Sequence, residues 1–436
     1  MRTEDESWVP KRAADAAAHV KPKLVRTTQS QTEEATMIAN KATMTVNKAG
    51  ILAAALAIFS CVSVAHAGKS YLLNGLDSKV GFSDSGAAVF LAPGDDLVNI
   101  MDISDPAHPR TVANLPLSNS LFGPPTNLQV TPDEKLALIS SAMKWVQKDG
   151  VWKPSPDDRL FVVDLETDPP ALIATLRIGR QPSGIAINST GDLVLVANRA
   201  DNSVSVLTID GKRVRLVDTV PVGDQVAAVA ITPDGKRALV VKNTTNKIGV
   251  LSINGTNVVY HDDLDMPVGQ FPYNIDITPD GSMAIVPHTG NGGRSDGHAD
   301  ALAIIDLSSG MPPRVSGYVT AGDAPEAFAI SPSGKIAVAL LLGGDVLLSG
   351  EHWAHSQKGS IAVFEIDGLN VVASQVIEIG GLPEGVAFSP NGEFLYVSSF
   401  VGKEVRVYKV ENTRVRDTGV RIPLPGHPGS MRARAR

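Results

Sequence analysis

The stretch Gly269-Gln-Phe-Pro-Tyr-Asn-Ile-Asp-Ile-Thr-Pro-Asp-Gly281 decides the fold, because the same phrase recurs along the chain. It joins a Gly-x-x-Pro turn, a short apolar strand, Ser or Thr, Pro-Asp-Gly and a second apolar strand. Other copies begin at Gly179, Gly223, Gly322 and Gly380, and shorter forms are Pro125–Glu134 and Val80–Gly86. Counted at the fourth position, copies at 182, 226, 272, 325 and 383 are 44, 46, 53 and 58 residues apart. Repeats of this length with four strands each are typical of β-propellers.

The third repeat shows how one unit divides into strands. Its expected strands are Gly184–Asn188, Leu193–Ala197, Ser203–Ile209 and Leu216–Val222. Pro fixes φ and Asp-Gly tolerates positive φ, which suits the tight turn between the first two strands. Seven phrases therefore predict an all-β chain folded as a seven-bladed β-propeller of four-stranded antiparallel sheets, with almost no helix after residue 68.

The closure of the ring is left open by the sequence. Val80–Gly86 resembles a complete first inner strand, so each blade could be built in chain order. However, Pro425-Gly-His-Pro-Gly-Ser430 resembles the start of one more Gly-x-x-Pro phrase. Either Ser70–Leu73 or that tail is expected to close the ring.

The phrase Glu384-Gly-Val-Ala-Phe-Ser-Pro-Asn-Gly-Glu-Phe-Leu-Tyr-Val-Ser-Ser399 resembles the YVTN repeat of bacterial propellers and the lactonase-type seven-bladed family. The resemblance covers nearly all of the chain after residue 67. It implies the fold and leaves the function open, because propellers host binding modules as well as several classes of enzyme. The Gly-His…Trp-Asp pairing of WD40 propellers is absent, as are the tryptophan-docking repeats of quinone-dependent alcohol dehydrogenases.

The N-terminal region has the pattern of a secretory signal peptide. An apolar run, Gly50–Val64, follows Lys41 and Lys48 and ends at the small-x-small site Ala65-His66-Ala67. This pattern predicts a signal peptide over 44–67, cleavage after Ala67, and a location in the periplasm or outside the cell. Residues 1–43 are polar and aperiodic, which predicts a disordered extension, and the natural start is expected at Met37 or Met44.

The single cysteine, Cys61, lies inside the apolar run. A lipoprotein anchor at Cys61 is an alternative, but Phe59 is bulky where such sites need a small residue. Cleavage after Ala67 leaves no cysteine, which excludes disulfides, a Cys-x-x-Cys-His haem site and thiolate metal sites. The charge of −7 gives no broad basic surface, so nucleic acid is not expected as a partner, and no membrane span is expected in the mature chain.

Three long connections point to one functional face. Ala142–Asp158, Thr289–Asp300 and Leu342–Gly359 each join the second and third strands of a blade, so strand alternation sends them to the same side as the Gly-x-x-Pro loops. Long loops in a regular repeat are more often functional than decorative. Trp145, Trp152 and Trp353 all lie in these insertions, either as binding contacts or as anchors of their own loops. Asp149-Gly150 predicts a type I′ turn at the tip of a ribbon, Lys144–Lys153.

Histidines gather in the same insertions. His288 ends a second strand, His298 lies in the following loop, and His352 and His355 lie in the insertion of the next blade. Neutral imidazoles with carboxylates could bind a divalent metal ion, although the spacing matches no strong metal motif. Solvated loop histidines are the alternative interpretation.

Two carboxylates follow the proline of the sixth and seventh phrases. Glu326 and Glu384 occupy the position filled elsewhere by Thr126, Ser183, Ala227 and Tyr273, and it should open on the axial channel. With Asn127 and Asn274 they could bind a hard cation. They could instead shift each other's pKa and act as an acid–base pair, or simply be hydrated.

Two functions of different class follow. The first is an exported binding module that holds a small molecule or a periplasmic partner protein on the loop-rich face. Its expected ligand-binding residues are Asn127, Trp145, Trp152, Lys242, Tyr273, Asn274, His298, His352, Trp353 and His355. The alternative, implied by the resemblance, is a lactonase-type hydrolase or isomerase that acts on a lactone or sugar acid at the channel mouth. There His288 or Glu326 would be the base, Arg294 or Lys242 would hold a carboxylate or phosphate, and Glu384 is a further catalytic candidate.

Overall fold

The computed structural model describes residues 69–82, 88–123, 125–291, 295–308, 311–344, 351, 355 and 358–435. They lie in one compact unit, Val64–Arg436. The signal-peptide prediction, Cys61, Arg294, His352 and Trp353 fall outside the described residues.

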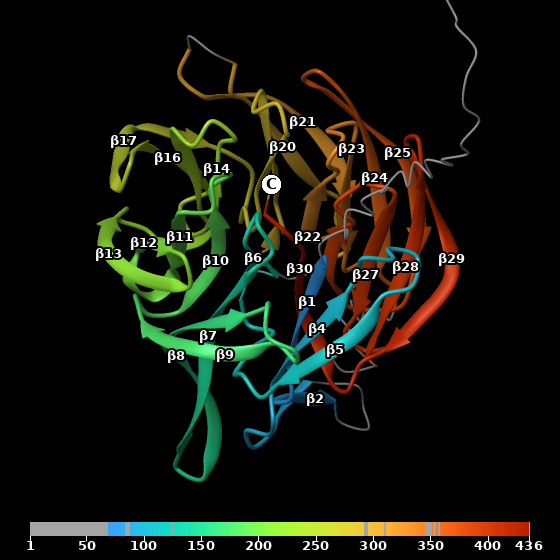
Figure 1. Cartoon of the computed structure of the whole chain (residues 1–436). Helices are drawn as coiled ribbons and strands as arrows, with labels where there is room; N and C mark the ends of the chain where they lie inside the picture. Colours follow the sequence, from blue (N-terminus) through green and yellow to red (C-terminus); the bar gives the residue numbers. More distant parts are fainter. Residues whose placement is uncertain are drawn as a thin grey trace, which may run out of the picture. The chain divides into compact units, whose positions relative to one another are not determined.

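Seven four-stranded antiparallel sheets follow one another around a common axis (Figure 1). From the axis outward, blade 1 contains β30 (His427–Arg432), β1 (Tyr71–Asp77), β4 (Leu97–Asp102) and β5 (Arg110–Leu115). Blade 2 contains β6 (Leu128–Val130), β7 (Leu136–Lys148), β8 (Val151–Asp164) and β9 (Ala171–Arg177). Blade 3 contains β10 (Pro182–Ile187), β11 (Leu193–Asn198), β12 (Ser203–Asp210) and β13 (Arg213–Pro221).

Blades 4 to 7 repeat the same order. Blade 4 contains β14 (Val226–Ile231), β15 (Arg237–Lys242), β16 (Lys247–Asn254) and β17 (Asn257–Pro267). Blade 5 contains β18 (Asp276–Ile277), β19 (Met283–Pro287), β20 (Asp300–Asp306) and β21 (Arg314–Gly322). Blade 6 contains β22 (Pro325–Ile330), β23 (Ile336–Leu341), β24 (Ser360–Asp367) and β25 (Asn370–Glu378). Blade 7 contains β26 (Pro383–Phe388), β27 (Phe394–Ser399), β28 (Glu404–Glu411) and β29 (Arg414–Pro423).

The hydrophobic core lies between neighbouring blades. The second strands β11, β15 and β23, for example, are rich in Val, Ile, Leu and Ala, and they are buried along all or nearly all of their length because adjacent sheets cover both faces. One cluster, for example, packs Leu138 and Val162 of blade 2 against Ile185 and Val196 of blade 3. The outermost strands are mostly exposed or half-buried, with only one or two buried residues each in β13 and β25.

The C-terminal tail closes the ring. β30 pairs with β1 and supplies the innermost strand of blade 1, so the Gly-x-x-Pro resemblance of Pro425–Ser430 was the correct choice. The alternative first inner strand at Val80–Gly86 was wrong. Val80–Phe82 (β2) pairs only with Ala88–Phe90 (β3), inside a long connection between β1 and β4. Because β1 already pairs on both sides, no place remains for Val80–Phe82 within the blade.

Regular helix is almost absent from the described residues. A short 3-10 helix, η1 (Arg199–Asp201), lies in the connection after β11. None of the described helices is long and apolar enough to cross a membrane. The predicted ribbon is present: β7 and β8 extend beyond blade 2 and project from it (Figure 1), with Asp149 and Gly150 both at positive φ in the turn.

Candidate active site

A recurring hydrogen bond shapes one mouth of the axial channel. In several blades the third residue of the Gly-x-x-Pro turn is left-handed, with φ of 54° at Gln181 and 50° at Ala324. Its carbonyl accepts the N–H of the residue after the second strand, as in Arg199 to Gln181 (3.1 Å) and Leu342 to Ala324 (3.2 Å). Each blade therefore brings the start of its inner strand and the residue after its second strand to the same rim.

Four side chains on this rim interact electrostatically. Glu326 and Glu384 are the second residues of β22 and β26, and Tyr273 precedes β18. Arg199, from η1, lies over the Tyr273 ring at 5.6 Å from its guanidinium carbon to the ring centroid. Glu384 is 2% exposed and Tyr273 is 8% exposed, whereas Arg199 and Glu326 are half-buried.

The two carboxyl groups lie in different environments. Burial raises the pKa of Glu384 well above its usual range, and the charge of Glu326 raises it further. Burial also raises the pKa of Tyr273, an effect that Arg199 opposes and the two carboxylates reinforce. Burial and the charge of Glu326 therefore both favour the neutral form of Glu384. Its Oε2 and the Nε of Arg199 have no hydrogen-bond partner among the described residues.

The neighbouring amides are largely committed to backbone contacts. Asn274 accepts the N–H of Ile275 (2.8 Å), and its Nδ2 donates to the carbonyl of Glu326 (3.5 Å). Asn127 donates to the carbonyl of Ser140 (2.9 Å), which leaves its buried Oδ1 without a partner in the described part of the chain. No described cluster of three or more His, Cys, Asp or Glu side chains could hold a metal ion.

An apolar cluster, called here the plug, packs over one side of this rim. It includes Leu121, Ala142, Trp145, Leu342, Leu382 and Phe400, from strand β7 of blade 2 and from loops of blades 1, 6 and 7. Leu342 and Phe400 occupy the same position in their blades as Arg199 does in blade 3. Gly429 occupies the position of Glu384 in blade 1, and a Cβ there would lie 3.1 Å from the Cα of Leu121. The absence of a side chain at Gly429 therefore lets the loop carrying Leu121 approach the inner strand.

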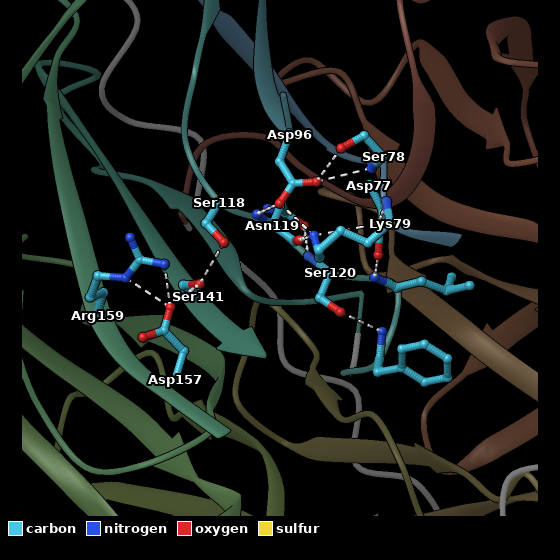
Figure 2. A network of polar contacts seen from close by, with 12 residues as sticks. Asp77, Ser78, Lys79, Asp96, Ser118, Asn119, Ser120, Ser141, Asp157 and Arg159 are labelled. Atoms are coloured by element: carbon cyan, nitrogen blue, oxygen red, sulfur yellow. Dashed lines mark hydrogen bonds and ion pairs between the residues drawn. The ribbon is translucent and has the colours of Figure 1, made fainter. Parts of the chain in front are cut away.

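A buried ionic network holds that loop (Figure 2). The Lys79 ammonium donates to a carboxylate oxygen of Asp96 and to the carbonyl of Asn119, and its Nζ lies 3.4 Å from Asp77 Oδ1. The other oxygen of Asp77 accepts the N–H of Leu121 at 2.7 Å. Lys79, Asp77 and Asp96 are all buried. The network therefore ties the connection between β1 and β4 to the loop that contributes to the plug.

Two predicted site residues face away from Arg199 and the glutamates. His288 accepts the N–H of Gly269 at Nε2 (3.2 Å), and its ring lies 6.0 Å from Tyr318 on the outer strand β21. Burial lowers the pKa of His288 to about 4. Lys242, at the same position in blade 4, donates to Tyr260 and to Asp265, both at 2.7 Å. These contacts give His288 and Lys242 structural roles. The catalytic and ligand-binding roles expected for them from the sequence stay predictions.

The remaining predicted residues are dispersed over the loops. Trp145 is buried and packs edge-on against Phe90, with ring centroids 5.6 Å apart, while Trp152 is half-buried against the plug. His298 is exposed, and His355 is half-buried in its insertion.

Sequence reasoning missed Arg199 and Lys79. Arg199 could have been found by aligning the residue after each second strand, where other blades have Ala142, Asn243, Thr289, Leu342 and Phe400. The long connection Ser78–Asp96, which contains Lys79, was not recognised because the sequence of Val80–Gly86 resembles the repeat phrase.

The fold and rim define a seven-bladed propeller with an acid pair and an arginine at one mouth of its channel. The family model for lactonases with a seven-bladed β-propeller matches residues 162–265, about a quarter of the chain. No relative was found among curated proteins.

Among solved structures, a candidate 6-phosphogluconolactonase of Bacteroides uniformis is 16% identical, with a TM-score of 0.64 over 84% of this chain and 99% of that one. The periplasmic gluconolactonase PpgL of Pseudomonas aeruginosa is 15% identical, with a TM-score of 0.61 over 84% and 99%. Hydrazine synthase of Kuenenia stuttgartiensis is 19% identical, with a TM-score of 0.54 over 72% and 90%. At this identity the likeness shows the fold alone, and these proteins differ in chemistry.

Proposed function

We propose that this protein hydrolyses a lactone of the sugar-acid type at the rim formed by Arg199, Tyr273, Glu326 and Glu384. The observation that carries the proposal is the buried Glu384 carboxyl, whose pKa is raised by burial and by Glu326, on a rim where both carboxyl groups and Arg199 act on Tyr273. Hydrolysis is preferred to non-catalytic binding because the matching family model and two of the similar structures carry lactonase names.

The proposed mechanism divides the work between the two carboxyl groups. Glu326, the half-buried member of the pair, accepts a proton from a water molecule while the oxygen of that water forms a bond to the lactone carbonyl carbon. Arg199 stabilises the negative charge that develops on the carbonyl oxygen. Glu384 then donates its proton to the ring oxygen as the carbon–oxygen bond of the ester breaks. The product is the open-chain hydroxy acid, and one proton returns from Glu326 to Glu384 through solvent.

The test is hydrolysis of glucono-δ-lactone and its 6-phosphate by purified protein, followed by acid release at constant pH after subtraction of the spontaneous rate. Glu384→Gln and Glu326→Gln should each lower kcat by about 100-fold or more, because each removes a proton-transfer group. Glu393→Gln, at an exposed site in a turn, is the matched control and should leave the rate unchanged. Equal rates for wild type and both site variants would overturn the proposal.

Export is part of the proposed function. We propose that the chain is cleaved between Ala67 and Gly68 and acts in the periplasm or outside the cell. Support comes from the Ala65-His66-Ala67 site. The intact mass of protein recovered from the exported fraction should correspond to a chain that begins at Gly68. A lipid-modified Cys61 at the mature N-terminus would support the lipoprotein alternative instead.

A further inference from the structure

The ribbon Met143–Pro156 has two edges without a strand partner in the described part of the chain. Its two strands pair with each other from Met143↔Pro156 to Lys148↔Val151. The inner strand β6 pairs with β7 only as far as Ile139, and the outer strand β9 pairs with β8 only from Arg159. Beyond the blade, the β7 edge therefore presents backbone N–H and C=O groups that can pair with another strand, whereas Pro154 and Pro156 remove two N–H donors from the β8 edge.

The two faces of the ribbon differ in chemistry. Trp145 and Trp152 share one face, which packs against the plug. The other, called here the lysine face, contains Lys144, Val146, Lys148, Val151 and Lys153, because residues opposite one another and two apart point to the same side. Val146 is 39% exposed and Val151 is 57% exposed.

The charge of the lysine face is not neutralised by the protein. All three lysines are exposed, and within the residues that the structure describes none of them forms an ion pair or hydrogen bond. Other surface lysines, such as Lys212 and Lys409, pair with carboxylates. The lysine face therefore carries three positive charges without a carboxylate partner among the described residues, in a chain with a net charge of −7.

We propose that the ribbon binds an extended acidic segment of a partner protein, which adds as a further strand to a free edge. Carboxylates of a strand added to the β7 edge would lie beside Lys144 and Lys148, and an apolar residue between them would contact Val146. Lys153 and Val151 lie one strand further away, on β8. A lipid surface fits less well, because the free backbone groups of the edges would find no partners in an apolar layer. This inference does not depend on the proposed hydrolysis.

The probe is a capped peptide that alternates valine and glutamate, titrated into the whole protein by calorimetry. We expect binding that weakens by about tenfold or more when Lys144, Lys148 and Lys153 are all replaced by Gln, because two cross-strand charge pairs and the nearby charge of Lys153 are lost. The matched control replaces Lys135, Lys236 and Lys335 by Gln. These lysines are exposed in turns on the opposite face, and the variant should bind as wild type does. Thermal unfolding checks that both variants are folded.

Three outcomes would overturn the inference. The first is no binding of the peptide at about 1 mM. In that case the lysines would serve only to prevent unwanted pairing of an exposed edge strand. The second is equal binding of a peptide methylated on alternate backbone nitrogens, which keeps the charges but cannot form a strand ladder. The third is equally lysine-dependent binding to phosphatidylglycerol vesicles. Loss of binding to the methylated peptide alone, with no binding to vesicles, would support strand addition.

Discussion

Replacing Lys79 by Met should destabilise the protein by removing the cation from a buried ionic network. Lys79 is 2% exposed, and the change would leave Asp77 and Asp96, 1% and 8% exposed, without their ammonium partner. Breaking a buried pair in this way costs about 3–5 kcal/mol. With an unfolding entropy of about 2.1 cal/mol/K per residue, the folded part of this chain gives about 0.8 kcal/mol/K, so the midpoint should fall by about 4–6 °C.

The pH dependence of this loss has a definite sign. Burial raises the pKa of Asp77 and Lys79 lowers it, so the variant raises that pKa further. A carboxyl group whose pKa is higher in the folded state stabilises the fold when protonated, and this contribution is lost as pH rises through the folded pKa. The deficit of the variant should therefore be small near pH 4 and larger near pH 7.

Calorimetric or circular-dichroism melting across pH 4–8 is the assay. Lys335→Met, at an exposed turn, is the matched control and should change stability by less than about 0.5 kcal/mol. Adding Asp96→Asn to Lys79→Met should recover part of the loss, because it removes one of the unpaired carboxylates. A midpoint equal to wild type, or a deficit that does not change with pH, would refute the reasoning.

Three further predictions concern stability. Trp145→Ala should lower the free energy of unfolding by about 3–5 kcal/mol, because it removes a large buried side chain from the plug. Deletion of Val146–Val151 should lower it little, because the tip is exposed. Chemical denaturation measures both, and a larger loss for the deletion would contradict this view of the ribbon. Removal of His427–Arg436 should abolish cooperative unfolding, because blade 1 loses its inner strand β30; a truncated chain with a wild-type melting curve would show that the ring does not need it. Burial lowers the pKa of His288 to about 4, so between pH 6.5 and 4 the unfolded chain binds a proton there and the folded chain does not. The wild-type protein should therefore lose about 3 kcal/mol of stability as the pH falls over that range. His288→Asn, which introduces the residue found at the equivalent Asn198, should remove this loss. Identical acid-denaturation profiles for this variant and wild type would count against that assignment.

The propeller itself was predictable because its information is local and repeated. Each Pro-Asp-Gly turn and each Val- and Ile-rich strand acts within a few residues of chain. The count of phrases predicted seven blades, although the inner strand of blade 1 is β30 and not Val80–Gly86. The tip of the ribbon was predictable for the same reason, since Asp149-Gly150 specifies its own turn.

Other features depend on which copies of the repeat meet in space. Val80–Gly86 imitates the inner-strand phrase, and only the pairing of β30 with β1 shows that the distant tail takes that place. The sequence predicted Glu326 and Glu384 at the channel mouth, but the raised pKa of Glu384 depends on its burial and on the charge of Glu326 from the neighbouring blade. His288 and Lys242 illustrate the converse, since both end a second strand and bond to outer elements. Thus the sequence by itself determined the architecture, because turns and strands are set by nearby residues, whereas the tertiary structure decided the site, because burial and electrostatic contact arise only when separate blades close into a ring.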